Sequence, residues 1–246
     1  MSSTPWFVKE SSVRLGQNAQ PVSQVDKWYR NYWERLQARE KLLKTLRPPC
    51  LYWYWSDTLN EVELLYYERA RGASRILDFG AGEGRLKGKF ISSGFKGRYE
   101  TLDISSESRH DYSTLSEVQG TYDAIFCLEV IEHMTLNDYV DLMDEFDRLL
   151  RLGGILVIST PNPSCVISMW SQDAGHVQQF PLPDLASDFV IRGYDIETFR
   201  IRLGERPKGI CLRIRFFLQR ILCYLLGADY ANGLVVIGNK KDTKVL

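Results

Sequence analysis

Residues 76–86 of the chain have the sequence ILDFGAGEGRL. The apolar pair Ile76-Leu77 is typical of the end of a strand that is buried on both faces of a sheet. Gly80, Gly82 and Gly84 then alternate, and glycine lets the backbone adopt positive φ and lets a ligand approach closely. The next residues open a helix whose free N–H groups point toward the same crevice. The stretch therefore predicts a nucleotide-type site at the carboxyl end of a parallel strand.

The glycine spacing differs from two common nucleotide motifs. D-x-G-x-G-x-G is not the dinucleotide pattern G-x-G-x-x-G, and no G-K-[ST] follows Gly84 as a phosphate loop requires. A second short strand, over residues 99–103, ends in Asp103, where a ribose-binding carboxylate is expected. A carboxylate can accept hydrogen bonds from both ribose hydroxyls. This acid favours a ligand site over the alternative of a tight turn without a ligand.

In these stretches the chain resembles the S-adenosylmethionine-dependent methyltransferases of the Rossmann-like class. The matching residues are LDFGAGEG (77–84), the acid of ETLDIS (Asp103), YDAIFCLEVIEHM (122–134) and LLRLGGILVISTPNP (149–163). The resemblance implies S-adenosylmethionine as cofactor, with its methionine and ribose part against the glycines and its ribose hydroxyls held by Asp103. The cofactor-binding residues that it implies are Asp78, Gly80, Gly82, Gly84, Asp103, Ile104, Asp111, Leu128 and Glu129.

The segment after Asp103 departs from the pattern of that family. Only residues 104–121 precede the next predicted strand, which leaves room for one short helix and a degenerate third strand. The family often places an acid or amide near the adenine at the end of the third strand. Asp111 is the nearest candidate for that role, and a surface turn is the alternative for it.

A second group of chemistry-bearing residues follows the predicted fourth strand, residues 122–127. Glu129, Glu132 and His133 stand at i, i+3 and i+4, and on one helical turn they would face the same way. His176 follows the predicted fifth strand, and the loops after strands four and five lie side by side in this fold. We therefore predict Glu132 and His133 as catalytic residues.

The same residues suggest two chemistries. Glu129, Glu132, His133 and His176 together offer mixed oxygen and nitrogen ligands that suit Mg²⁺, Mn²⁺, Zn²⁺ or Fe²⁺. Such an ion would bind vicinal hydroxyls and lower the pKa of the hydroxyl to be methylated. Without a metal, His133 would act as a general base that Glu132 orients. The sequence leaves both open.

E-x-x-E-H with a later histidine resembles the metal-dependent small-RNA 3′-terminal 2′-O-methyltransferases and the ubiquinone-biosynthesis O-methyltransferases. It also occurs in relatives with no known metal. We expect O-methylation of a small molecule, a sugar or a glycolipid, although a nitrogen acceptor would need less help from a base. The alternatives are 2′-O-methylation of RNA 3′ ends and a catalytically silent cofactor-binding partner subunit. A formal net charge of zero weighs against nucleic acid.

The predicted fold class is α/β: a Rossmann-like, doubly wound, seven-stranded sheet with its last strand antiparallel. We expect a flexible arm (1–25), a helical cap (26–70), a methyltransferase domain (71–240) with a helical insertion (205–230), and a tail (241–246). The cap contains the aromatic run LYWYW, at residues 51–55. These rings either stack on a substrate or pack the cap onto the sheet, and packing is favoured for most of them.

The insertion predicts a helix over residues 208–226. Ile210, Ile214, Phe217, Ile221 and Leu225 form one apolar stripe. Arginines in the same segment exclude a membrane span. Contact with a membrane surface or a lipid-linked substrate is one interpretation. A helix packed on the sheet, with its arginines in solvent, is the favoured one.

Length and composition indicate the number of domains and the cellular compartment. At 246 residues the chain is one domain, or one domain with additions. Its five cysteines contain no C-x-x-C, which favours buried free thiols in a reducing compartment. The N-terminus has no basic-then-apolar signal, and no apolar run is long enough to span a membrane. We therefore expect a cytoplasmic protein, and the sequence leaves its oligomeric state open.

Overall fold

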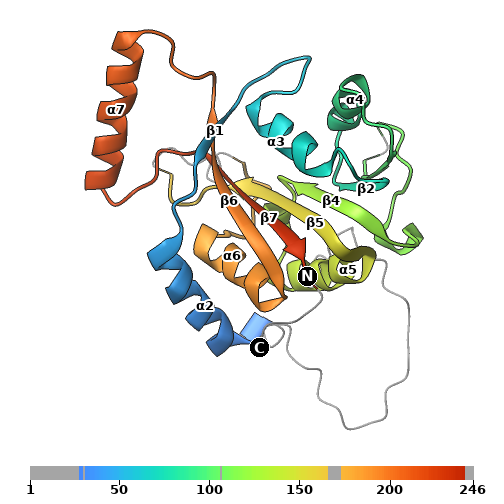
Figure 1. Cartoon of the computed structure of the whole chain (residues 1–246). Coiled ribbons are helices and arrows are strands. Elements are labelled where there is room, and N and C mark those ends of the chain that lie inside the picture. The colour runs from blue at the N-terminus through green and yellow to red at the C-terminus, as the bar shows by residue number, and fades with distance from the viewer. Residues whose placement is uncertain (1–27, 30, 106, 166–172, 242–246) are drawn as a thin grey trace.

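Seven strands form one mixed sheet in the order β1-β6-β7-β5-β4-β2-β3 (Figure 1). The computed structural model describes residues 28–29, 31–105, 107–165 and 173–241. The predicted arm, and all of the predicted tail beyond residue 241, lie outside the described residues. The strands are β1 (Cys50–Trp53), β2 (Arg75–Phe79), β3 (Arg98–Leu102), β4 (Tyr122–Leu128), β5 (Leu150–Pro161), β6 (Tyr194–Leu203) and β7 (Gly233–Lys240).

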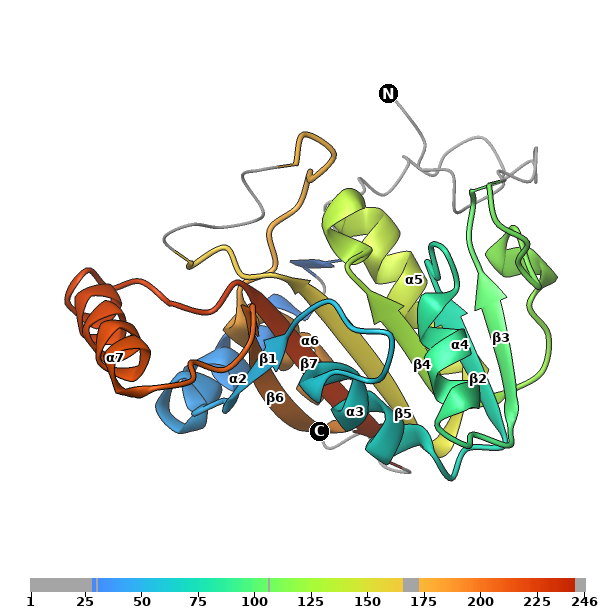
Figure 2. The same ribbon diagram turned by 90° about the horizontal axis from the view of Figure 1, so that it is seen from above.

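Helices cover both faces of this sheet (Figure 2). On one face, α3 (Glu61–Ala70) and α4 (Arg85–Ser92) bury Val62, Tyr66 and Phe90 against the strands. On the other face, α5 (Leu136–Leu149) and α6 (Leu182–Ile191) bury a second apolar cluster. The remaining helices are α2 (Tyr32–Thr45), which contacts α6, α7 (Ile210–Leu225), and the short 3₁₀ turns η1 (Leu115–Glu117) and η2 (Ile131–His133).

The strand directions confirm the predicted doubly wound topology. β2 is parallel to β3 and β4, and β4 is parallel to β5. β7 is antiparallel to both β5 and β6, as predicted for the last strand. β6 therefore runs in the direction of β5, and β1 is parallel to β6. The carboxyl ends of these six strands lie at one edge of the sheet, where ligands bind in open α/β folds. The central position of β4 explains its continuous apolar sequence, because both of its faces are covered.

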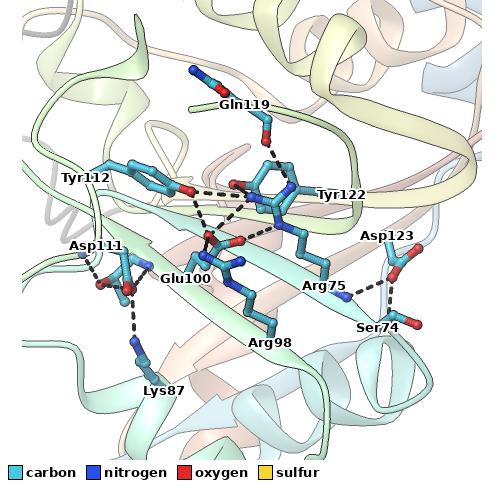
Figure 3. Close-up of polar contacts among 11 residues, drawn as sticks. Ser74, Arg75, Lys87, Arg98, Glu100, Asp111, Tyr112, Gln119, Tyr122 and Asp123 are labelled. Atoms are coloured by element: carbon cyan, nitrogen blue, oxygen red, sulfur yellow. Dashed lines mark hydrogen bonds and ion pairs between the residues drawn. The ribbon is translucent and has the colours of Figure 1, made fainter. Parts of the chain in front are cut away.

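The structure corrects the position of one of the seven strands. Among the described residues of the 104–121 segment, no third strand forms. Instead, Tyr112 makes a single parallel bridge with Leu102. The segment is too short for a helix and a strand, and polar contacts hold it to the edge strand β3 (Figure 3). The buried Glu100 accepts a hydrogen bond from the Tyr112 hydroxyl at 2.7 Å and pairs with Arg75 and Arg98.

The seventh strand is β1, so the predicted cap is not helical throughout. Residues 50–53 pair in parallel with β6 from Cys50–Arg200 to Trp53–Leu203. Aromatic and apolar side chains favour extended structure when a sheet edge is available. Leu51 and Trp53 pack against the apolar cluster beneath α3, which confirms the packing role for these two residues. Trp55 is 71% exposed.

Helix α7 stands apart from the sheet in both views (Figures 1 and 2). The packing on the sheet that the sequence favoured is wrong, because Cys223 is its one buried residue. No helix within the described parts of the chain combines the length and the apolar character needed to cross a bilayer.

Candidate active site

The glycine-rich loop has the backbone conformation that its sequence predicts. Gly80, Gly82 and Gly84 have φ values of 73°, 54° and 70°. A Cβ on Gly80 would lie 2.3 Å from Cγ2 of Val130, so the loop touches the segment after β4 without room for a side chain. The N–H groups of Gly80 and Ala81 donate to the carbonyl of Leu102, at 2.8 and 3.2 Å. These contacts seat the loop across the carboxyl ends of β2 and β3.

Asp103 lies directly beside this loop. Its carboxylate accepts hydrogen bonds from the N–H groups of Gly82, at 2.7 Å, and Ser105, at 2.8 Å. A carboxylate has about four acceptor positions, so capacity remains for the two ribose hydroxyls. The next side chain, Ile104, is 45% exposed. It therefore offers free apolar surface next to the predicted ribose site.

Asp78 is a buried carboxyl group at the end of β2. It is 3% exposed and accepts a hydrogen bond from the Tyr99 hydroxyl at 2.9 Å. Burial, helped by the nearby charge of Asp103, raises its pKa to about 7. A cation next to Asp78 would stabilise the ionised form.

A cavity of about 550 Å³ opens at the same sheet edge, within the size range of small-molecule sites. Of the residues predicted to bind the cofactor, Asp78, Gly80, Leu128 and Glu129 line it. The other five predicted residues lie on the loops around it or at the edge strand. Trp53 and Trp55 of the aromatic run 51–55 line it as well. The cavity also has lining residues that the sequence did not assign to a site: Tyr66, Arg85, Ser159 and Asn232.

For Arg85, the sequence contained a sign that it belongs to a site. The guanidinium of Arg85 lies over the ring of Trp55, 3.8 Å from its centroid. A basic residue directly after the glycines departs from the preference of the helix dipole for acids in the first turn. Tyr66 and Ser159 gave no such signal, since their positions fit an ordinary helix core and an ordinary strand end.

Glu129 has an unusual backbone. It is the one non-glycine residue with positive φ, 55°, among those that the structure describes. Its carboxylate accepts a hydrogen bond from the Ser159 hydroxyl at 2.6 Å. Because the chain turns here, Glu129 does not share the 3₁₀ turn η2 that carries Glu132 and His133. The single helical turn expected for all three residues is therefore wrong.

A second cluster brings together Glu132, His133 and His176. One ligand atom from each lies within 4.8 Å of the other two, and Glu129 is not part of this group. Glu132 is 1% exposed and accepts a hydrogen bond from the Thr160 hydroxyl at 3.1 Å. Burial, followed by the charge of Glu129, raises the pKa of Glu132 to about 8.

The loop after β5 is held against η2 by backbone contacts. The carbonyl of Glu132 accepts from the N–H groups of Val177 and Gln178, at 2.8 and 3.1 Å. Nδ1 of His133 lies 3.1 Å from the carbonyl of Gly175. A carbonyl can only accept, so Nδ1 carries a proton in this contact, and in the neutral imidazole the lone pair is on Nε2. The neutral form of His133 with its proton on Nδ1 suits a base or a metal ligand.

Asp111 occupies a different environment. Its carboxylate accepts from the backbone N–H of Thr101 at 2.9 Å and from Nζ of Lys87 at 3.0 Å (Figure 3). Desolvation opposes its ionised form, but these bonds outweigh it and lower its pKa. Asp111 thus fastens the loop to the edge strand β3, and its contact with adenine stays a prediction.

The fold and the site define a Rossmann-like nucleotide-binding domain, and comparison with known proteins identifies its family. Residues 31–198, more than half of the chain, match the family model described as methyltransferase domain. The chain belongs to this family and is a class I S-adenosylmethionine-dependent methyltransferase. No curated protein matches it.

Two solved structures share the fold. One is a SAM-dependent methyltransferase from Archaeoglobus fulgidus, with a TM-score of 0.54 and 14% identity, covering 86% of this chain and 98% of that one. The other is the YcgJ protein from Bacillus subtilis, with a TM-score of 0.50 and 15% identity, covering 74% of this chain and 98% of that one.

Proposed function

We propose that this methyltransferase transfers the methyl group of S-adenosylmethionine to an oxygen of a small molecule, a sugar or a glycolipid. The observation that carries the proposal is the orientation of His133 at the rim where β4 and β5 end: its Nδ1 contacts the Gly175 carbonyl, which leaves Nε2 for an acceptor. An acceptor oxygen attacks the methyl carbon, the carbon–sulfur bond breaks, and S-adenosylhomocysteine leaves. The acceptor proton passes to Nε2 of His133. Alignment and proton removal are all that the protein must supply, because a sulfonium is a good leaving group.

The cofactor roles follow from the loop geometry. Asp103 would hold the ribose hydroxyls, and Asp78 would face the cationic methionine part of the donor. A Gly82→Arg variant should abolish donor binding, because a large side chain would occupy the loop where φ is 54°. Calorimetric titration with S-adenosylhomocysteine measures this. Unchanged affinity in the variant would contradict the proposed location of the cofactor.

We further propose Glu132, His133 and His176 as ligands of a divalent ion such as Mg²⁺, Mn²⁺ or Zn²⁺. One carboxylate and two imidazoles are a donor set that suits such ions. A cation there would also stabilise the ionised form of the buried Glu132, whose pKa burial raises to about 8. When bound, the ion would lower the pKa of an acceptor hydroxyl. Glu129, whose carboxylate is bonded to Ser159, is outside this set in the structure.

One experiment distinguishes a divalent metal site from a metal-free general base. Mg²⁺, Mn²⁺ and Zn²⁺ are titrated calorimetrically into protein saturated with S-adenosylhomocysteine. One-site binding that is lost in His133→Ala and His176→Ala would support the metal site. His110→Ala is the matched control, because His110 is the one other histidine of the chain and lies outside the cluster. Absence of binding to the wild type would leave His133 as a metal-free general base.

Methylation of RNA 3′ ends is a second candidate, favoured by this same metal-type cluster. It predicts acceptance of a ribose end and a steep dependence of RNA binding on salt. Assays with radiolabelled donor on a catechol, a sugar diol and a short RNA distinguish the acceptors. If none of a broad acceptor panel is methylated while S-adenosylhomocysteine binds, the chain is a silent cofactor-binding subunit.

A further inference from the structure

Helix α7 presents a broad apolar face to solvent. Ile210, Tyr224 and Leu225 are 71%, 83% and 73% exposed. At about 100° per residue they share one side of the helix with other exposed apolar residues: Ile214, Phe217, Leu218 and Ile221. Large contiguous apolar surfaces on a protein mark sites of interaction.

The opposite side of α7 faces the body of the protein. Arg202 of β6 donates a hydrogen bond to Oε1 of Gln219 at 3.1 Å, and its guanidinium lies over the ring of Phe216. Cys223, one turn further along this side, is the one buried residue of the helix. These contacts fix the rotation of α7, so its apolar face points away from the body of the protein.

Arginines border the exposed apolar face. Helical spacing places Arg213 and Arg220 along one edge and Arg215 along the other. The helix contains no acidic residue, and residues 200–220 include seven cationic residues against one acid, Glu205. Glu205 is already paired with Lys208. Within the described ranges, Arg213 and Arg215 form no ion pair, so their charges are available to an anionic surface.

We propose that α7 docks this protein onto the surface of an anionic lipid bilayer. Its apolar face would enter the boundary between headgroups and acyl chains, and its arginines would contact lipid phosphates. The long arginine side chains can reach the headgroups while their stems lie along apolar surface. At 16 residues, with three arginines, the helix suits the plane of the interface rather than a span.

A second copy of this chain is a poorer occupant of the same face. In a twofold contact through α7, the arginines along the edges would approach those of the other copy. Neither chain has an acidic residue in this helix to offset that repulsion. An anionic lipid surface complements both the apolar face and its charged borders.

The base of the insertion connects the docking helix to the active-site region. Leu203, Asn232 and Gly233, which lie before and after the segment that carries α7, line the cavity at the sheet edge. Docking would therefore bring the cavity close to the lipid surface. The docking itself does not depend on which acceptor is methylated.

Flotation with vesicles tests the proposal on the full chain without donor or acceptor. We expect binding to vesicles of phosphatidylcholine mixed with phosphatidylglycerol and weaker binding to phosphatidylcholine alone. The double variant Ile214→Glu with Leu218→Glu should lower the partition coefficient about tenfold or more. Arg213→Gln with Arg215→Gln should lower it about 30-fold on the anionic vesicles only. Leu152→Glu is the matched control, since Leu152 is 55% exposed on β5, away from α7.

Folding of each variant is checked by its affinity for S-adenosylhomocysteine, which α7 does not contact in the proposed site. The proposal is overturned if the wild type does not float, or if the Ile214→Glu, Leu218→Glu variant floats as well as the wild type. A concentration-dependent dimer that this variant dissociates, without vesicle binding, would identify a second copy as the occupant instead. An environment-sensitive dye on the exposed Cys211, with Cys50 and Cys165 changed to Ser, should shift to the blue on vesicles.

Discussion

The imidazole of His133 lies edge-on to that of His176, with ring centroids 4.7 Å apart and ring planes at 61°. The two rings come from loops that follow different strands, β4 and β5. Backbone contacts between Glu132 and the loop after β5 hold them together. The pair is therefore a product of the tertiary fold, and its geometry is sensitive to small changes in either loop.

Gly175→Ala tests how strictly this geometry matters. A Cβ at Gly175 would lie 3.2 Å from Nδ1 of His133 and 3.1 Å from Oδ1 of Asp173, so the imidazole must shift. We expect kcat to fall about tenfold to a hundredfold, because small misplacements of a catalytic group are costly. Affinity for S-adenosylhomocysteine should not change. Gly72→Ala, where a Cβ meets open space, is the control, and an unaltered kcat would refute the role of His133.

Gly80→Ala should weaken cofactor binding and destabilise the fold. The new Cβ would overlap Cγ2 of Val130, and alanine is strained at φ 73°. The combined effect is expected to be about 2 to 3 kcal/mol in the free energy of unfolding, measured by chemical denaturation. Adding Val130→Ala removes the overlap but not the strain, so it should restore part of the loss. Full restoration would show that backbone strain is unimportant here.

Asp78 should make donor binding depend on pH. Its pKa of about 7 means that the carboxyl is protonated in mildly acidic solution, whereas the cationic donor favours the carboxylate. We expect affinity for S-adenosylmethionine to rise about tenfold from about pH 6 to about pH 8, with proton uptake by the buffer. Calorimetry in buffers of different ionisation enthalpy measures both. Asp78→Asn should remove the dependence, and a flat wild-type profile would contradict the contact.

The same raised pKa has an opposite effect on stability without ligand. Between about pH 4 and about pH 7 the native state retains a proton that the unfolded chain has released. The free energy of unfolding of the wild type should therefore fall as pH rises through this window, relative to that of Asp78→Asn. Thermal unfolding of both proteins across this range gives the difference.

Glu100→Gln should loosen the edge of the sheet. Glu100 is 1% exposed and pairs with Arg75 and Arg98 while accepting from Tyr112. Without this negative charge, the guanidinium groups of Arg75 and Arg98 lose their ionic partner. We expect this to lower the free energy of unfolding by about 2 to 3 kcal/mol. Glu68→Gln removes an exposed pair with Arg71 and should change it by less than about 1 kcal/mol. Equal effects of the two substitutions would argue against the network.

The elements that sequence predicted correctly are those whose signal is local. The glycine loop is one, since positive φ at Gly80, Gly82 and Gly84 follows from residue type and spacing. Strand β4 is another, because a continuous apolar run suits a central strand. The convergence of His133 with His176 was also foreseen, since adjacent strands bring their following loops together.

The features that sequence missed depend on distant partners or on one backbone angle. Residues 50–53 become a strand only because β6, far along the chain, offers a free edge. Glu129 leaves the helical turn because of its positive φ, for which its residue type gives no signal. For α7, the apolar stripe was visible, but periodicity alone does not say whether the sheet covers it.

The insertion that carries α7 connects β6 and β7, and the pairing of these two strands does not depend on it. The two strands pair without a break from Tyr194–Lys240 to Ile201–Gly233, so the segment that carries α7 leaves and re-enters the sheet at neighbouring points. Such a segment can be lengthened, exchanged or replaced by a tight turn while the strand pairing survives. Recombination of this one insertion during evolution could thus change where the enzyme is located or what it binds, while the residues of the active site stay the same.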